Sequence, residues 1–418
     1  MEIVRVVHFS TYGPFGGAGK AAHRIHTGLL GAGCDSWMVV ANKAGGQDRV
    51  VEAGDQHRQV GWTLKSRERI EAYSDFSPDL SSLSHRYAHE LELPVTPDII
   101  HLHWIAGFLF AYDIRQLWLR YRTPIVWTMP DLLPVTGGCH YSGGCDGFTR
   151  RCGCCPILRS PNENDISRRS WTAKSRWLRD VPVTAVAISR SYLDITKRSS
   201  LFRDTPSVTI PYGIDDSIFR PRRRDGARNI LRLPASARII FFGAVNHRDD
   251  RKGMKYIVEA LRLLPTLLDP GTIPIVLTVG AGTENYAETL PFQCFELGQI
   301  ADDRLMALAY QAADVFVCAS VEDAGPMMIA EALLCGVPVV AFDSSGFGAD
   351  LIQPNTNGYM AKTQDAEDLA RGIREVLRQT AAGTLTPESC RNSVLSQCGI
   401  RAQSDSYLEL YDKLLNAE

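Results

Sequence analysis

Short apolar runs alternate with helix-length segments along almost the whole chain. The runs are rich in β-branched and aromatic residues, which is typical of strands buried on both faces. They are Ile3–Phe9, Trp37–Val40, Ile99–Leu102, Ile125–Trp127, Val183–Ile188, Ile239–Phe242, Ile275–Val279, Val315–Cys318 and Val337–Ala341. Buried strands joined by helices pair in parallel, with helices on both faces of the sheet. The pattern therefore predicts an α/β fold.

The runs are too many for one ordinary sheet, and 418 residues suffice for two or three domains. We predict two doubly wound, Rossmann-like domains, at 1–212 and 213–395. The Pro-Gly segment Ile210–Asp215, which a polar stretch follows, is the predicted hinge. The tail Ser404–Leu415 has helical apolar spacing, so 396–418 is predicted as a closing helix.

Composition excludes several classes of protein. A net charge of −2 gives no support to a general nucleic-acid binder. No apolar run is long enough for a membrane span. The first residues form a strand pattern without the charged and apolar regions of a signal peptide. We therefore expect a cytoplasmic protein.

The motif most informative about function lies at 317–340. An apolar strand is followed by a polar turn, a Gly-Pro pair, a run of helix formers that ends at a glycine, and a second apolar strand. Proline suits the first helical turn and glycine suits the stop. Free N–H groups of Gly325, Met327 and Met328 at the helix start would form a seat for a phosphate.

Two acids, Asp323 and Glu331, flank this helix start. Carboxylates are poor phosphate ligands but accept hydrogen bonds from sugar hydroxyls, so the pair indicates a nucleotide sugar. The alternative is two solvated acids that interact favourably with the helix dipole.

The block resembles the signature of the retaining family-four glycosyltransferases, which have the GT-B fold. Their motif has two acids separated by seven residues, an apolar helix and then C-G-x-P-V-V, as here. The resemblance implies that Glu331 binds the nucleotide ribose. It also implies that Asp323, where glutamate is usual, lies near the donor sugar.

A glycine-rich loop, Gly13–Lys20, follows the first strand and opens a helix. Glycines there allow the backbone to approach an anion at the helix start. A P-loop is excluded because Ala21 replaces the Ser or Thr that would hold Mg²⁺. The loop resembles the family's P-x-x-G-G-A element, which implies that Gly16 and Gly17 face the donor diphosphate. A tight turn that requires glycine is the alternative.

The segment Phe241–Gly253 joins a strand to a helix in the second predicted domain and is rich in cations. Cations at the carboxyl end of a strand can neutralise a leaving diphosphate without a metal. The family carries G-R-x-x-x-x-K-G here, which implies that Lys252 binds the donor. Ala244 stands where the arginine is usual, so Arg248 or Arg251 must substitute, and we favour Arg248. A charged surface loop is the alternative.

The first domain departs from the family on its acceptor side. Relatives usually carry T-x-H-D at the end of the corresponding strand, and this chain has Pro130 in place of that histidine. The acceptor-side chemistry is then expected to move to His103, Asp131 or His140, or the protein is catalytically weak or inactive. A lone histidine in a strand is more often structural, which is the alternative for His103.

Five of the eleven cysteines lie between Cys139 and Cys155. Cys139, Cys145, Cys152 and Cys155 have the spacing C-x5-C-x6-C-x2-C, which can close a tetrahedral structural zinc site. Paired or free thiols are the alternatives, although disulfides are disfavoured in the cytosol. This insertion, at 137–157, resembles that of an exopolysaccharide, colanic-acid-type subgroup of the family, with T-G-G-C-H-Y and C-G-x-C-P.

The stretch Arg168–Arg179 places Trp171, Lys174 and Leu178 on one helical face, with arginines around them. A basic-aromatic helix can bind an anionic membrane surface or a lipid diphosphate. This reading implies peripheral contact with the inner membrane. The alternative is a solvated helix whose tryptophans enter the core.

The resemblance implies a retaining glycosyltransferase without a catalytic metal. The donor is a nucleotide diphosphate sugar held mainly by the second domain, and it meets a saccharide or lipid-linked acceptor in an interdomain cleft. The expected role is bacterial surface polysaccharide synthesis. Two alternatives remain: an inactive GT-B protein that binds nucleotides or regulates, and a zinc-stabilised interaction module.

Overall fold

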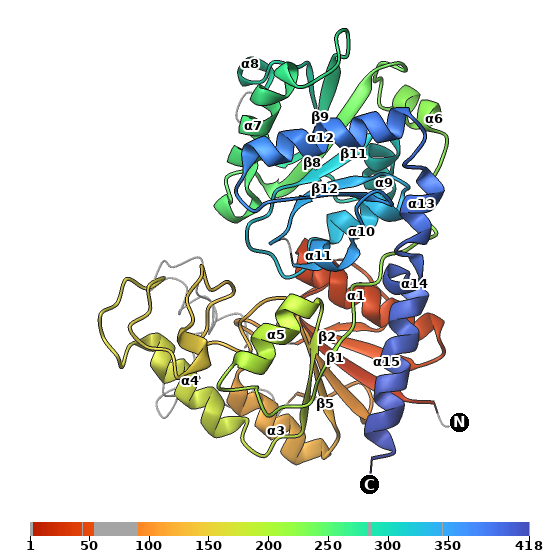
Figure 1. Ribbon diagram of the computed structural model, residues 1–418. Helices are drawn as coiled ribbons and strands as arrows, with labels where there is room; N and C mark the ends of the chain where they lie inside the picture. Colours follow the sequence, from red (N-terminus) through yellow and green to blue (C-terminus); the bar gives the residue numbers. More distant parts are fainter. Residues whose placement is uncertain (1–2, 44, 54–90, 283–285, 345, 418) are drawn as a thin grey trace. The chain divides into compact units, whose positions relative to one another are not determined.

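The computed structural model describes residues 3–417 except 44, 54–90, 283–285 and 345. The chain divides into two compact units (Figure 1). The first comprises Met1–Gly213 together with Gln403–Glu418, and the second comprises Ile214–Ala402. The end of the second unit, expected at 395, lies at Ala402. The reason is that Cys390, Val394 and Cys398 belong to the core of that unit.

The first unit is built on a seven-stranded sheet with the order β3-β2-β1-β4-β5-β6-β7. All its strands pair in parallel. The strands are β1 (Arg5–Tyr12), β2 (Asp35–Asn42), β3 (Val50–Glu52), β4 (Ile99–Leu102), β5 (Ile125–Met129), β6 (Val183–Ala187) and β7 (Ser207–Thr209). The helices are α1 (Gly16–Gly31), α3 (Ala111–Tyr121), η2 (Gly147–Thr149), α4 (Ile166–Trp177) and α5 (Arg190–Arg198).

The second unit repeats this plan with a six-stranded parallel sheet of order β10-β9-β8-β11-β12-β13. The strands are β8 (Arg238–Asn246), β9 (Pro274–Ala281), β10 (Cys294–Glu296), β11 (Val315–Cys318), β12 (Val339–Phe342) and β13 (Gly358–Ala361). The helices are α6 (Arg224–Ile230), η3 (Asp250–Lys252), α7 (Met254–Leu263), η4 (Leu264–Thr266), α8 (Tyr286–Thr289), α9 (Asp303–Ala312), α10 (Met327–Leu334), α11 (Phe347–Leu351), α12 (Ala366–Ala381), α13 (Pro387–Asn392) and α14 (Leu395–Cys398). The predicted fold class, two doubly wound parallel α/β domains, is confirmed.

Successive residues of the buried strands supply opposite faces of the second sheet. Phe241 packs with Leu333 of α10 in one cluster, whereas Phe242 packs with Ile257 of α7 in another. Side chains alternate along a strand, so a strand that is apolar at every position must be covered on both sides. This is why the apolar runs predicted the strands.

The last helix, α15 (Ile400–Leu415), supplies part of the cover of the first sheet. Tyr407, Leu410 and Tyr411 share a buried cluster with Val6 of β1 and Ile25 of α1. The first domain is therefore assembled from both ends of the chain.

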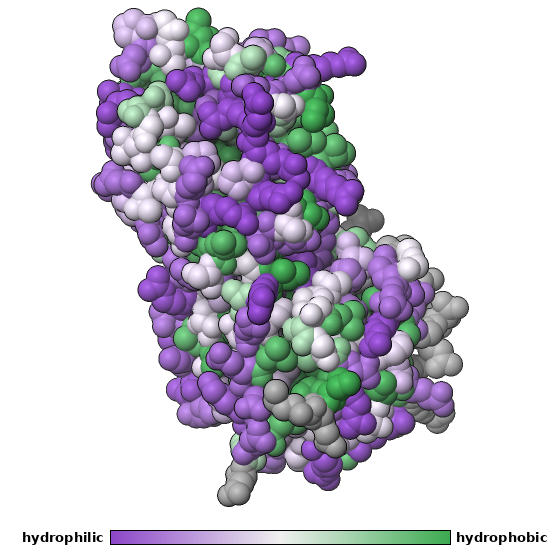
Figure 2. All heavy atoms as spheres, turned by 90° about the vertical axis from the view of Figure 1, so that its right-hand side faces the viewer, coloured by the Kyte–Doolittle hydropathy of each residue, from purple (hydrophilic) through white to green (hydrophobic). Residues whose placement is uncertain are grey.

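No helix in the described ranges has the length and apolarity that a membrane span requires. On the face drawn in Figure 2, hydrophilic and hydrophobic residues are interspersed.

Candidate functional site

Lys252 and Asp323 meet at the carboxyl ends of two adjacent strands of the second sheet. Lys252 lies in η3, beyond β8, and Asp323 lies in the loop beyond β11, which pairs with β8. The Nζ atom of Lys252 donates to Oδ2 of Asp323 at 2.5 Å. The lysine side chain remains 27 % exposed, whereas that of Asp323 is 9 % exposed. A cation thus lies at the position where ligands bind in doubly wound sheets.

The pKa of Lys252 is raised above its usual value. Burial alone would lower this pKa, but the charge and the hydrogen bond of Asp323 outweigh it. Lys252 is therefore a permanent cation at neutral pH and can balance phosphate charge.

Glu331 lies in the second turn of α10, with its side chain largely buried. Its Oε2 atom accepts a hydrogen bond from the hydroxyl of Tyr310, at 3.1 Å. Burial, and then the charge of Glu331, raise the pKa of Tyr310 well above its usual value. Tyr310 therefore stays protonated and fixes the orientation of the carboxylate. The sequence analysis did not identify this tyrosine as part of the site.

At the start of α10, one of the three N–H groups predicted to bind a phosphate is already hydrogen-bonded. The N–H of Gly325 donates to Oδ1 of Asp323 at 3.1 Å, so this amide is already occupied. Met327 and Met328 do form the first turn of the helix, as expected from the sequence. The predicted seat therefore narrows to these two residues.

Gly253, directly after Lys252, has a backbone that other residues cannot easily adopt. Its φ is +66°, and a Cβ atom added there would lie 1.9 Å from the carbonyl oxygen of Ala319. The glycine therefore allows η3 to pack against the end of β11, which brings Lys252 to Asp323.

Replacing Gly253 with alanine is expected to destabilise the second domain by at least about 2 kcal/mol, through backbone strain and the clash with Ala319. Urea denaturation followed by circular dichroism measures the loss. Gly226→Ala in α6 is the matched control, because its added Cβ would meet no atom within 4 Å. Equal stability of the two variants would contradict this account of Gly253.

The two candidate arginines have different surroundings. Arg248 is exposed, and its main-chain N–H donates to Asn246. Arg251 is paired with Asp249 at 2.6 Å, and its guanidinium also donates to the carbonyl of Glu322. Arg251 is thus held beside the Lys252–Asp323 pair, which favours it over Arg248 as the substitute for the usual arginine.

In the first domain, Asp131 is the centre of a polar and aromatic cluster at the end of β5. Its Oδ2 atom lies 2.5 Å from Nδ1 of His140 and accepts from the indole N–H of Trp104 at 2.7 Å. The rings of Trp104 and His140 stack at 5.5 Å, and Tyr12 stacks on Trp104 at 5.3 Å. The cluster brings an Asp–His pair beside Pro130, where relatives carry a histidine.

Gly16 and Gly17 open α1 and are exposed. No side chain caps this helix start, whose N-cap residue is Phe15. Deeper in the helix, a Cβ atom at Gly19 would lie 2.1 Å from the carbonyl oxygen of Gly13. The loop thus needs glycine for close packing, and the role of Gly16 and Gly17 towards a diphosphate stays a prediction.

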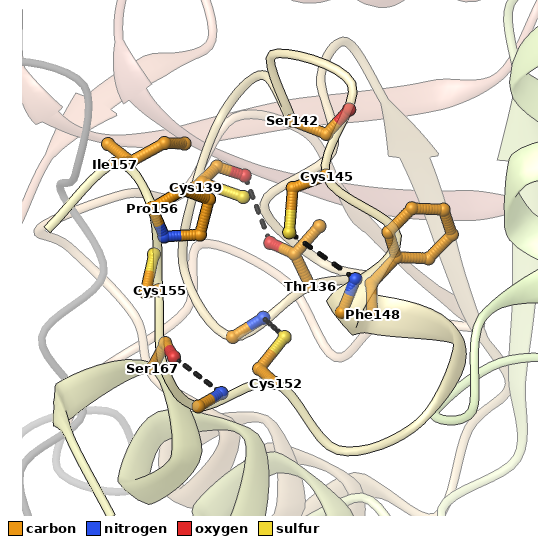
Figure 3. Close-up of a pocket in the computed structure, with 13 residues that line it drawn as sticks. Thr136, Cys139, Ser142, Cys145, Phe148, Cys152, Cys155, Pro156, Ile157 and Ser167 are labelled. Carbon is orange, nitrogen blue, oxygen red and sulfur yellow. Dashed lines mark hydrogen bonds between the residues drawn. The ribbon is translucent and has the colours of Figure 1, made fainter. Parts of the chain in front are cut away.

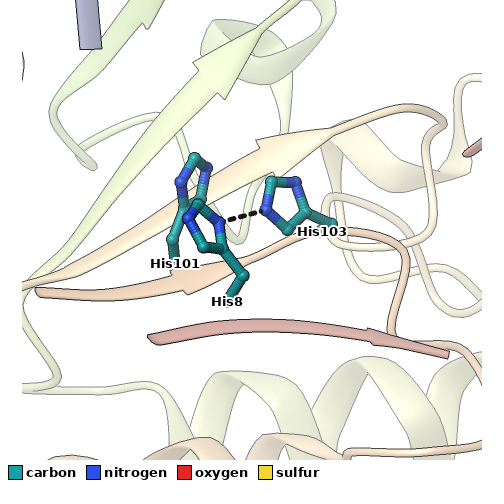
Figure 4. A group of neighbouring side chains, drawn as sticks. All are labelled: His8, His101 and His103. Atoms are coloured by element: carbon teal, nitrogen blue, oxygen red, sulfur yellow. Dashed lines mark hydrogen bonds between the residues drawn. The ribbon is translucent and has the colours of Figure 1, made fainter. Parts of the chain in front are cut away.

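His103 lies in a buried group with His8 and His101, shown in Figure 4. Nε2 of His103 is 2.8 Å from Nδ1 of His8, and the rings of His101 and His103 are 4.2 Å apart. Residues two apart on a strand share a face, which explains this contact. His103 is only 3 % exposed and lies against His8 and His101. The structure therefore favours the structural alternative for His103 over catalysis.

The same histidine group is linked to the last helix. Nδ1 of His101 is 2.7 Å from the hydroxyl of Tyr411, and Nε2 is 2.7 Å from the hydroxyl of Thr128. Thr128 in turn bonds the hydroxyl of Tyr407. These bonds satisfy buried polar groups and fix α15 on the first sheet.

The helix α4 uses its predicted face within the domain. Lys174 is 3 % exposed and donates to the carbonyls of Leu133 and Thr136, at 2.5 and 3.2 Å. The indole of Trp171 donates to Ser200. These contacts favour the structural alternative for this helix over membrane binding.

The four predicted zinc ligands, Cys139, Cys145, Cys152 and Cys155, line one cavity of the first domain (Figure 3). None of them is in a disulfide.

Comparison with known proteins identifies the second domain. A family model described as "Glycosyl transferases group 1" matches residues 236–379, which include Lys252, Asp323 and Glu331. This segment is similar to the group 1 glycosyltransferases. The match covers the strands and the α10 start around which the candidate donor site is built.

Similarity to named glycosyltransferases extends over longer parts of the chain. The putative colanic acid biosynthesis glycosyl transferase WcaC of Escherichia coli is 20% identical, over 98% of this chain and 100% of its own length. The D-inositol 3-phosphate glycosyltransferase of Mycolicibacterium smegmatis is 28% identical over 68% of this chain and 61% of its own.

Solved structures show the same fold over the whole chain. The sucrose-phosphate synthase of Thermosynechococcus elongatus covers 99% of this chain and 100% of its own, with a TM-score of 0.67 and 18% identity. Anabaena Alr3699/HepE, solved in complex with UDP and glucose, covers 98% of this chain and 100% of its own, with a TM-score of 0.65 and 14% identity. The chain thus has the two-domain fold of GT-B glycosyltransferases.

Proposed function

We propose that this protein is a retaining glycosyltransferase that moves a sugar from a nucleotide diphosphate sugar to a saccharide or lipid-linked acceptor in bacterial surface polysaccharide synthesis. The observation that carries the proposal is the pairing of Lys252 with Asp323, which lies just before α10, together with Glu331 in the second turn of that helix. The named relative in colanic acid biosynthesis supports the polysaccharide context.

The donor would be held by charge and by oriented hydrogen-bond acceptors. Lys252 and Arg251 would balance the diphosphate, and the first-turn amides of α10 would donate to its oxygens. Glu331, oriented by Tyr310, would accept from ribose hydroxyls. Asp323, fixed by Lys252 and by the Gly325 amide, would lie near the sugar.

Leaving-group stabilisation would then come from fixed protein charges rather than from a metal. As the bond to the donor sugar breaks, negative charge grows on the diphosphate. Lys252, permanently protonated, would interact more strongly with that growing charge than with the ground state, which is the condition for rate acceleration.

The acceptor hydroxyl would be oriented by the first domain. Asp131 and His140 form a hydrogen-bonded pair beside the position of the missing family histidine, and Trp104 and Tyr12 offer aromatic surface of the kind that packs on sugar rings. The pair would orient the acceptor and accept its proton. The inactive alternative rests on Pro130, and the Asp131–His140 pair argues against it.

A donor panel tests the proposal. The full-length protein is incubated with UDP- and GDP-sugars, and binding is followed by thermal shift, because a ligand that binds only the folded state raises the unfolding temperature. Released nucleotide is measured with and without saccharide acceptors. Binding with turnover supports the enzyme, binding without release supports the inactive alternative, and no binding at all contradicts both.

Glu331→Ala is expected to weaken nucleotide-sugar binding by roughly 10- to 100-fold, because it removes an acceptor of charge-assisted hydrogen bonds. Isothermal titration calorimetry measures the affinity for the donor found in the panel. Glu367→Ala, on the exposed face of α12, is the matched control. Unchanged affinity in a folded Glu331→Ala protein would exclude the ribose role.

A further inference from the structure

We propose that Cys139, Cys145, Cys152 and Cys155 bind one structural zinc ion that fixes the loop carrying His140. Zinc prefers four thiolates in tetrahedral arrangement at structural sites. The site is supported by the cavity that the four cysteines line, by main-chain donors to two of the sulfurs, by the contacts that hold the loop, and by a buried lysine nearby.

The four side chains converge on a common space. They line a cavity of about 20 Å³, together with Thr136 and Phe148 (Figure 3). A space of this size accommodates a single small ligand such as a water molecule or an ion. The adjacent Cys154 does not line it and instead donates to the carbonyl of Pro161. The loop thus separates four inward cysteines from one outward cysteine.

Two of the sulfurs already accept main-chain hydrogen bonds. The N–H of Gly137 donates to Sγ of Cys152 at 3.2 Å, and the N–H of Gly147 donates to Sγ of Cys145 at 3.3 Å. Such bonds are weak towards a neutral thiol but strong towards a thiolate, and they tune metal–thiolate centres. The main chain is therefore arranged for charged sulfur.

From Cys139 to Leu158 the loop buries few apolar side chains, namely those of Phe148 and Cys155. Its buried cluster is centred on Cys155, and between β5 and α4 the described elements include only the short helix η2. A long loop without a core needs another constraint to keep one conformation. Part of it comes from α4, because Asp165 accepts from the N–H of Cys155 and Arg168 donates to the carbonyl of Cys152. A zinc ion would supply the rest by joining both ends of the loop.

A buried cation lies close enough to compensate the charge of a zinc–thiolate site. Zinc with four thiolates carries a net charge of −2, which is costly to bury without a compensating cation. The buried ammonium of Lys174 donates to the carbonyls of Leu133 and Thr136, and Thr136 lines the same cavity as the four cysteines. On binding, each thiol that becomes a ligand releases its proton to solvent.

The sulfurs must move inward to bind. Within the described part of the chain, one group of three possible metal ligands has its ligand atoms all within 4.8 Å of one another, and it consists of His8, His101 and His103. The sulfur atoms of the cysteines are more widely spaced. Zinc–sulfur bonds of about 2.3 Å require rotation of the cysteine side chains towards the centre. The histidine group is the weaker candidate, because both nitrogens of His101 already bond hydroxyl groups.

The zinc would act on the acceptor side through His140, which follows Cys139 directly. The carbonyl of Cys139 accepts from Thr136, and that of His140 accepts from the N–H of Leu132. Holding Cys139 therefore holds His140 against Asp131. This consequence, unlike the metal site itself, rests on the proposed function.

Metal analysis of the full-length protein, purified without chelators, tests the site. We expect about one zinc ion per chain by mass spectrometry. Replacement by Co²⁺ should give intense thiolate-to-cobalt charge-transfer bands in the near ultraviolet, which a histidine site would not give. Zinc-free protein that takes up no zinc, or a disulfide among the four cysteines, would overturn the proposal.

Variants separate this site from its neighbours. Cys152→Ser should lower zinc affinity at least about tenfold, whereas Cys154→Ser, in the same loop, should retain zinc. Loss of zinc in both variants, or in neither, would contradict the assignment. If Cys152→Ser does not fold, the cobalt spectrum of the wild type still shows whether the metal is bound by thiolates. Because the proposed donor site lies in the second domain and the cysteines lie in the first, failure of the proposed function would leave the zinc content unchanged.

Discussion

Lowering the pH from 7 to 5 is expected to destabilise the first domain by roughly 2 kcal/mol for each of its buried histidines His8, His26, His101 and His103. Burial, and then the neighbouring imidazoles, lower the pKa of His8 and His101 well below 6.5. The same causes lower the pKa of His103 to about 3 and that of His26 to about 4.

The sign follows from proton binding. Each of these histidines binds a proton near pH 6.5 when the chain is unfolded, but only at much lower pH when it is folded. Their contribution to stability is therefore present above about pH 6.5 and is lost as the pH falls towards the folded pKa. The four together lose on the order of 7 kcal/mol by pH 5, which is comparable to the whole stability of a domain.

Tryptophan fluorescence can follow this domain alone. All seven tryptophans lie within the first 177 residues, so urea unfolding curves recorded by fluorescence report on the first domain. Recording them from pH 7.5 to 5 should show a falling midpoint. The range ends above the region where most carboxylates titrate.

His103→Gln provides the control for this prediction. Glutamine keeps a donor and an acceptor near His8 but does not titrate, so the pH slope should decrease by about 1.4 kcal/mol per pH unit. An unfolding midpoint that does not change between pH 7 and 5 would contradict the assignment of these histidines as neutral buried groups.

Lys252→Met is expected to lower turnover by about 10²- to 10³-fold, the effect of removing one fixed charge that stabilises a leaving group. Methionine keeps much of the side-chain volume, so packing around Gly253 is preserved. Because the lysine side chain is 27 % exposed, the broken ion pair should cost little stability beyond the unpaired Asp323. Initial rates with the donor from the panel measure the effect.

Lys255→Met, on the exposed side of the adjacent helix α7, is the matched control and should keep full turnover. Circular dichroism and thermal unfolding establish that both variants are folded. A folded Lys252→Met protein that loses less than about tenfold in kcat/KM would exclude leaving-group stabilisation by this residue.

The central strands could be predicted from the sequence, but the edge strands could not. Central strands such as β8 and β11 contain runs that are apolar at every position, Ile239–Phe242 and Val315–Cys318, because helices cover both faces of the sheet. β3, β7, β10 and β13 lie at the four sheet edges and are only three or four residues long. An edge strand has a neighbour on one side only, so its sequence carries a weaker pattern.

Within the candidate site, the sequence identified the residues fixed by local spacing. Each of the residues Lys252, Asp323 and Glu331 belongs to a motif whose residues lie close together in the sequence, so the motif can be recognised without a structure. Tyr310 became visible only through its contact with Glu331, because it lies on a different helix.

The cluster around Asp131 in the first domain likewise could not be predicted from the sequence. Trp104, Asp131 and His140 come from three separate segments, and nothing in their spacing shows that one carboxylate oxygen joins them. His103 was expected to be a candidate for catalysis, but its position at the end of a strand does not show that His8 and His101 bury it.

The position of α15 has a consequence for biosynthesis. The ribosome delivers Tyr407 and Tyr411 after every strand of both sheets, so Val6 and Ile99 lack these partners in the growing chain until the second domain has been made. The second domain has all its strands and its helices up to α14 before that moment. The first domain therefore receives its last helix only after the second domain has been made, although its strands are made earlier.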